Sequence, residues 1–262
     1  MLYDLAQPLA KHYLLLNLVR YISFRSGAAC MTALVVSFII GPALIRWLRR
    51  VQRQGQPIRG DGPERHVIEK AGTPTMGGVL ILFASLSATL LWVDLRNRYI
   101  WAVLLVTLGY GVLGFADDYL KLARRNHKGM SGRSKLIGQA VIGLAASTWI
   151  MLTTDGSLGS VLAVPVFKDA LIQLGWFFPV FGMLVMLGSS NAVNLTDGLD
   201  GLAIVPTIIV AAVFALIAYL VGNRIFADYL QLHPVPGAGE LAVFCSALIG
   251  AGLGFLWFNA PP

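Results

Sequence analysis

The architecture of this chain follows from residues 99–118, which read YIWAVLLVTLGYGVLGFADD. Eighteen uncharged residues, most of them apolar, are followed by two adjacent aspartates. A helix of about 20 apolar residues is long enough to cross the hydrocarbon core of a bilayer, so this stretch predicts a transmembrane helix. Because Asp117 and Asp118 end the stretch, we expect the acidic pair to lie at a membrane boundary.

Similar apolar stretches recur along the 262 residues. Apolar residues make up 56% of the sequence and charged residues 13%, against about 25% charged residues in soluble proteins. We therefore predict an all-α, polytopic membrane helical bundle that forms a single integral-membrane domain over residues 1–262. Residues 1–26 are expected to form a helix in the membrane interface. Seven spans are expected, near residues 27–46, 74–93, 99–118, 135–152, 174–193, 201–221 and 240–258.

Basic residues are concentrated on one side of the predicted bundle. Residues 46–70 and 121–135, which follow the first and third spans, carry thirteen lysines and arginines. The loops after the second, fourth and sixth spans carry only Arg96, Arg98, Lys168 and Arg224. By the positive-inside rule the thirteen face the cytoplasm, which puts the N-terminus outside. The net charge of +7 is thus explained by membrane topology, and nucleic acid is not expected as a partner.

The acidic pair at the end of the third span needs compensation. Adjacent carboxylates at a membrane edge repel each other and lose hydration. A Mg²⁺ ion would compensate them, because hard cations take carboxylate and phosphate oxygens together. The alternative is an ordinary solvated helix end, helped by the nearby Lys121 and Arg124.

A second polar segment, residues 191–201, reads NAVNLTDGLDG and lies between the fifth and sixth spans. Asn, Asp and Gly are common turn residues, and a simple turn needs about two or three of them. Six occur in these eleven positions, so a binding loop is favoured over a turn. Its candidate ligand-binding side chains are Asn191, Asn194, Asp197 and Asp200.

A third segment, residues 70–78, reads KAGTPTMGG and opens the second span. Lys70, the hydroxyl of Thr75 and main-chain amides at a helix N-terminus suit an anionic phosphate. A helix cap followed by close helix packing explains the same residues equally well.

Five segments taken together resemble the polyprenyl-phosphate N-acetylhexosamine-1-phosphate transferase superfamily. They are DGPERH at 61–66, KAGTPTMGG at 70–78, GFADDY at 114–119, GSSNAVNLTDGLDGLA at 188–203 and GLGFLWFN at 252–259. The acidic pair and the Asn/Asp segment occur across the superfamily. TPTMGG with the preceding DGP is more particular to the branch that acts in peptidoglycan synthesis.

The resemblance implies an activity and a set of site residues. The activity is transfer of phospho-MurNAc-pentapeptide from its UDP carrier to undecaprenyl phosphate in the bacterial inner membrane, which forms lipid I and UMP and uses Mg²⁺. Asp117 and Asp118 match the catalytic pair and are the expected metal ligands. The matching substrate-binding residues fall into two sets. Six match the nucleotide-side pocket: Lys70, Thr75, Asn191, Asn194, Asp197 and Asp200. Lys121 matches a basic residue beside the site, and Asn259 matches the asparagine after the seventh span. A homodimer is left open.

Members of the superfamily continue for about three more spans after the position of Asn259. That part holds a third essential aspartate and a histidine cluster, so we expect a further metal ligand there and no turnover by the 262 residues alone.

Two other functions are compatible with parts of the pattern. One is transfer of GlcNAc-1-phosphate to the same lipid, and the other is secondary transport. Transporter sites usually lie near the bilayer midplane on broken helices. The carboxylates here are expected at the inner edge, where a soluble nucleotide can meet a lipid headgroup, and this favours a transferase.

Overall fold

A computed structural model describes residues 1–9, 13–52, 77–124, 129–154, 157–164, 167, 169–196 and 202–259. In chain order the elements, with η for 3-10 helices, are α1 Leu2–Leu9, η1 Leu14–Arg20, α2 Ile22–Val51, α4 Gly78–Trp92, α5 Arg98–Ala123, α6 Gly132–Thr153, η2 Ser157–Ser160, β1 Val161–Ala163, β2 Leu171–Gln173, η3 Gly175–Phe177, α7 Phe178–Thr196, α8 Ile204–Gly222, α9 Arg224–Tyr229 and α10 Glu240–Asn259. The two short strands pair antiparallel, with Val161 opposite Gln173.

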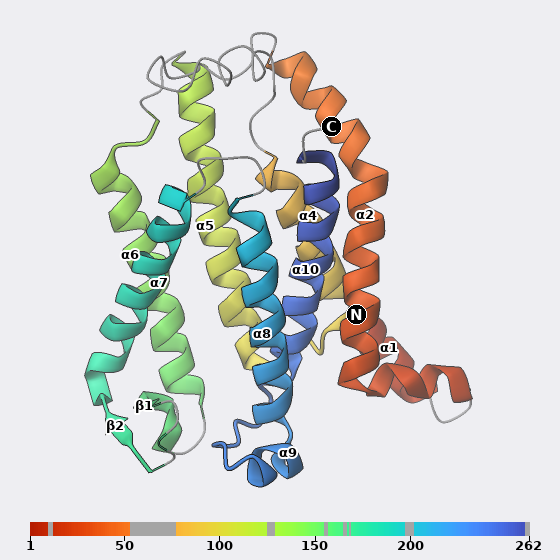
Figure 1. Ribbon diagram of the computed structural model, residues 1–262, viewed down its shortest axis with the longest axis vertical. Helices are drawn as coiled ribbons and strands as arrows, with labels where there is room; N and C mark the ends of the chain where they lie inside the picture. Colours follow the sequence, from red (N-terminus) through yellow and green to blue (C-terminus); the bar gives the residue numbers. More distant parts are fainter. Residues whose placement is uncertain are drawn as a thin grey trace.

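The long helices run up and down in a bundle (Figure 1), as the apolar stretches predict. We call the end where α2, α5, α7 and α10 finish the upper end, and the end that carries the β-hairpin and α9 the lower end. Within the described residues, six helices are long and apolar enough to cross a membrane: α2, α5, α6, α7 together with η3, α8 and α10. The predicted second span is represented by α4, which has 15 residues, and residues 74–76 of that prediction lie outside the described residues. The chain is therefore a multi-pass membrane protein.

Several predicted boundaries differ from the structure by a few residues, and three of these differences concern the N-terminal region and the acidic pair. The expected single helix over residues 1–26 is divided into α1, η1 and the start of α2, with Tyr21 in an extended conformation before α2. The helix α2 begins at Ile22, five residues early, because the charge of Arg25 is neutralised inside the bundle by Glu240. The acidic pair does not end its helix, since α5 continues to Ala123. Lys121 supports this extension by pairing with both acids at i+3 and i+4 spacing.

The core of the bundle is built around α10. Along the most apolar stretch of α10, 44% of the residues are buried, compared with 6% along that of α7. The helix α10 packs against α2, α4 and α8. The contact surface consists of small residues: Ala29, Ala33, Ala84, Ala88, Val243, Ala247 and Ala251. A Cβ on Gly250 would overlap the main chain of Cys30, so the backbones of α2 and α10 touch. Close packing of small residues is what joins helices in a bilayer, where lipid is as apolar as a leucine side chain.

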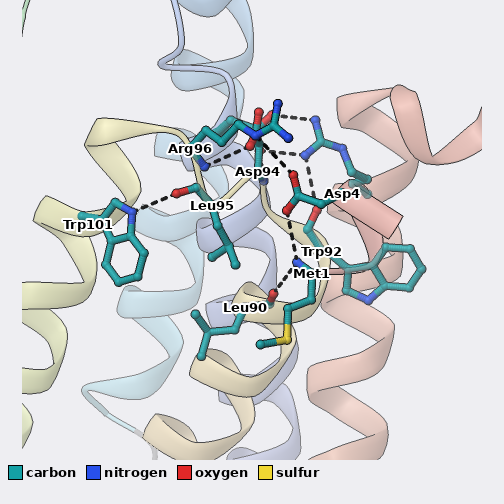
Figure 2. A network of polar contacts seen from close by, with 10 residues as sticks. Met1, Asp4, Leu90, Trp92, Asp94, Leu95, Arg96 and Trp101 are labelled. Atoms are coloured by element: carbon teal, nitrogen blue, oxygen red, sulfur yellow. Dashed lines mark hydrogen bonds and ion pairs between the residues drawn. The ribbon is translucent and has the colours of Figure 1, made fainter. Parts of the chain in front are cut away.

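A buried ion pair joins α2 and α10 at the lower end of this core. The guanidinium of Arg25 on α2, which is 2% exposed, donates to Glu240 Oε2 at 2.7 Å and Oε1 at 2.5 Å on α10. Glu240 also accepts from the Asp94 N–H at 3.0 Å. Beside this pair, the Arg96 Nε lies 3.6 Å from the carboxylate of Asp4, which attaches α1 to the turn between α4 and α5 (Figure 2).

The helices that carry the acidic pair and the Asn/Asp segment form a second group. The helix α6 packs against both α5 and α7. A Cβ on Gly143 of α6 would lie 3.3 Å from the Cα of Met183 on α7, so these two backbones also come close. Because α6 touches both neighbours, it sets how α5 and α7 are placed relative to each other.

Candidate active site at the upper end of the bundle

The acidic pair lies on the last two turns of α5, together with one lysine. The Lys121 Nζ is 2.8 Å from Asp117 Oδ2 and 3.1 Å from Asp118 Oδ1. The Asp117 side chain is 14% exposed and that of Asp118 is 35% exposed. One ammonium group therefore bridges two carboxylates and offsets the repulsion between them, as expected for adjacent acids at a membrane edge.

The second oxygen of Asp117 is held by the connection between α5 and α6. Its Oδ1 accepts a hydrogen bond from the main-chain N–H of Met130 at 2.7 Å. Gly129 makes this approach possible, because a Cβ at that position would overlap the Asp117 carboxylate. A solvated helix end therefore describes Asp118 better than Asp117, whose carboxylate is anchored on both oxygens.

Asn191 lies on α7 and is directed into the bundle. Its Nδ2 donates to Gln139 Oε1 of α6 and to the Leu187 main-chain oxygen, both at 2.9 Å. Both N–H groups of the amide are thereby used within the protein, which leaves its Oδ1 as the group that can accept from a ligand. Residues 191–196 are helical, so a turn does not describe the first six residues of the predicted binding loop.

The remaining predicted site residues fall into two groups. Asn194 is exposed, one turn after Asn191 on α7, and Asn259 is the half-buried last residue of α10. Both helices finish at the upper end, where α5 also finishes (Figure 1). The other four predicted residues, Lys70, Thr75, Asp197 and Asp200, lie outside the described residues.

The structure brings three of the predicted residues, Asp117, Asp118 and Lys121, into direct contact. Asn191 is bonded to Gln139, the eighth residue of α6, which lies about 10 Å along the helix axis from the first residue of that helix. The acidic pair is held just before α6, through Met130. The two halves of the candidate site are therefore connected through α6.

Sequence reasoning did not single out Gly129, Met130 or Gln139. The signal for Gln139 was present, because an uncharged polar residue inside an apolar span is expensive and often functional. No signal identifies Met130, since it contributes only a main-chain N–H and its side chain plays no part in the bond.

Several known proteins are similar to this chain in sequence. Residues 100–262 match the model of glycosyl transferase family 4, and residues 70–82 match signature 1 of the phospho-N-acetylmuramoyl-pentapeptide-transferases. Proteins named phospho-N-acetylmuramoyl-pentapeptide-transferase are similar to the whole chain. The one from Granulibacter bethesdensis is 74% identical over 262 residues and the one from Gluconacetobacter diazotrophicus is 62% identical over 263, with 72% of each relative covered. The one from Maricaulis maris is 56% identical over 267 residues, with 73% of that relative covered.

A polytopic helical bundle that matches glycosyl transferase family 4 along most of its length defines a membrane-embedded transferase. The chain belongs to the phospho-N-acetylmuramoyl-pentapeptide-transferase family. This membership confirms the resemblance carried by the sequence motifs, and it does not favour a secondary transporter.

Proposed function

We propose that this protein transfers phospho-MurNAc-pentapeptide from its UDP carrier to undecaprenyl phosphate, at the cytoplasmic face of the bacterial inner membrane. The products are lipid I and UMP, and the reaction serves peptidoglycan synthesis for the cell wall. The observation that carries the proposal is the cluster of Asp117, Asp118 and Lys121, anchored by the Met130 N–H at the upper end of the bundle. The names of the relatives, which are 74% and 62% identical in sequence to this chain, support the same substrates. The segments 46–70 and 121–135 carry thirteen basic residues and begin on the last turns of α2 and α5, both of which finish at the upper end, and this supports a cytoplasmic orientation of that end.

The reaction forms one P–O bond and breaks another. An oxygen of the lipid phosphate attacks the β-phosphorus of the UDP-sugar, and the bond from that phosphorus to the bridging oxygen breaks to release UMP. Asp118 is the more exposed carboxylate and uses one oxygen on Lys121, so we assign it to orienting and deprotonating the lipid phosphate. Asp117, held by Lys121 and Met130, fixes the geometry of the pair. Lys121 adds positive charge where two phosphates must meet.

The acidic pair also fits the Mg²⁺ ion expected for this family. The Lys121 ammonium lies within 3.1 Å of an oxygen of each aspartate, and this shared contact with one cation supports a divalent ion at the pair. Asp117 and Asp118 would hold the ion, and bound there it would offset the charge that develops on UMP. Among the described residues no group of three or more His, Cys, Asp or Glu side chains could hold a metal, so further ligands are assigned to substrate phosphate and to protein outside those residues.

The test is the single substitution Asp118→Asn in the complete gene product that contains this chain. Lipid I formation from labelled UDP-MurNAc-pentapeptide should fall at least about a hundredfold, the usual loss when a general base is removed. The matched control is Asp228→Asn, which changes an exposed aspartate on α9 at the lower end and should leave transfer intact. Substantial turnover by Asp118→Asn would reject the assigned role. Equal or better use of UDP-GlcNAc by the unmodified protein would reject the proposed substrate in favour of GlcNAc-1-phosphate transfer.

A further inference from the structure

A buried polar cluster joins α5, α6 and α7 beneath the acidic pair. Gln139 of α6 is 4% exposed. It accepts a hydrogen bond from Asn191 at 2.9 Å and donates one from Nε2 to the hydroxyl of Ser190 at 3.2 Å. The hydroxyl of Tyr110 on α5 donates to the main-chain oxygen of Gln139 at 3.2 Å. Gln139 is thus bonded to both neighbouring helices.

Stability alone does not account for this cluster. Hydrogen bonds between helices in a bilayer contribute little net free energy, because separated helices find other partners in the membrane. A buried glutamine moreover destabilises the fold when it loses a hydrogen-bond partner, because an unpaired polar group is costly to bury. A fully bonded buried network does, however, select one packing arrangement over others. Here it selects the rotation of α7 about its own axis, because a shift by one residue turns the side chains by about 100° and would direct Asn191 away from Gln139.

The same helix supports both halves of the proposed site. Met130, just before α6, holds Asp117, and Gln139, about 10 Å along α6, holds Asn191. Asn194 follows Asn191 by three residues on the same helix. We infer that Gln139 is a positioning residue, which holds the upper end of α7 and its nucleotide-side residues in place relative to Asp117. This inference rests on the transferase function proposed above.

The test replaces Gln139 with methionine, which has nearly the same size and no amide. The KM for UDP-MurNAc-pentapeptide, the KM for undecaprenyl phosphate and kcat are measured on the complete gene product. We expect the KM for the nucleotide substrate to rise about tenfold, as for a buried amide left without its partner, and the KM for the lipid to change less than about twofold. Gln139→Glu keeps an acceptor for Asn191 and should restore the nucleotide KM. Gln139→Asn is one methylene too short and should behave like methionine, and it serves if the methionine variant does not fold.

The matched control is Ser147→Ala, two turns further along α6. Ser147 is 2% exposed and lies against Gly182 of α7, and within the described residues its hydroxyl has no hydrogen-bond partner. It therefore belongs to the same helix interface without linking the two helices, and its loss should leave both KM values unchanged. In the background of Asn191→Leu, the change Gln139→Met should add no further effect. An unchanged nucleotide KM in Gln139→Met, an equal rise for both substrates, or the same rise in Ser147→Ala would overturn the inference.

A second readout separates this inference from the proposed reaction. Hydrogen exchange at the main-chain amides of residues 190–196 should become faster in Gln139→Met and stay unchanged in Ser147→Ala, whatever substrate the protein uses. If exchange responds in this way but the unmodified protein makes no lipid I, the proposed reaction fails and the link between α6 and α7 stands. If Asp118→Asn abolishes transfer but Gln139→Met changes neither hydrogen exchange nor the nucleotide KM, the positioning role of Gln139 is rejected and the proposed reaction stands.

Discussion

The buried ion pair at the lower end of the bundle allows a quantitative test of the fold. Substituting Glu240→Leu removes both carboxylate oxygens that face Arg25, and it also removes the acceptor of the Asp94 N–H. Arg25 is 2% exposed in the unmodified chain, and its contacts with the Trp92 main-chain oxygen at 3.3 Å and the Tyr3 ring at 4.3 Å do not supply a countercharge. Leaving one partner of a buried pair without the other costs about 3–5 kcal/mol. The unfolding equilibrium constant should therefore rise by roughly a hundredfold to several thousandfold.

The chain contains its own probes for this measurement. Cys30 on α2 and Cys245 on α10 are free thiols, both only partly exposed, and a thiol-reactive fluorogenic dye reports their exposure on unfolding. A titration with a denaturing detergent, followed with this dye, gives the free energy of unfolding of each variant. The double variant Arg25→Met with Glu240→Leu should recover most of the loss, because replacing both members of a buried pair by apolar residues is often neutral.

A control on the same scale comes from the exposed pair at the lower end, Arg224 with Asp228, whose side chains are 88% and 63% exposed. Asp228→Leu should change the free energy of unfolding by less than about 1 kcal/mol, since solvent screens such pairs. The reasoning is refuted if Glu240→Leu destabilises no more than Asp228→Leu. It is also refuted if the double variant is as unstable as Glu240→Leu alone.

Two further predictions concern glycines, each paired with a control glycine at which an added Cβ would meet no heavy atom within 4 Å. Gly129→Ala places a methyl group on the Asp117 carboxylate, so transfer should fall at least about tenfold through misplacement of a site group, with little loss of stability. The control Gly132→Ala should keep full transfer in the same assay. Equal activity of the two variants would show that the contact between Gly129 and Asp117 is unimportant. Gly250→Ala forces α2 and α10 apart and should destabilise the bundle by about 1–3 kcal/mol in the detergent titration, whereas Gly27→Ala should be neutral or slightly stabilising because alanine favours a helix. A neutral Gly250→Ala would contradict direct contact between the two backbones.

Composition and spacing are sufficient to predict the architecture. A bilayer demands helices of a set length with internally satisfied backbone groups, and loop charge follows membrane sidedness. These constraints act on each segment separately, so the span predicted near 240–258 agrees with α10 at both ends, and the span predicted near 99–118 begins within one residue of α5. The grouping of Asp117, Asp118 and Lys121 was equally accessible, because residues three and four apart share a face of one helix.

The contacts that shape the site depend instead on which helices meet and how each is rotated. Arg25 finds its partner 215 residues away, and this contact extends α2 beyond its predicted start. Gln139 meets Asn191 across 52 residues. The anchor of Asp117 is a main-chain N–H, a group that every residue except proline possesses and that no sequence pattern marks. Periodicity along the chain specifies which face of a helix can be buried. Close packing of several helices in the folded protein then selects the helix that packs against that face.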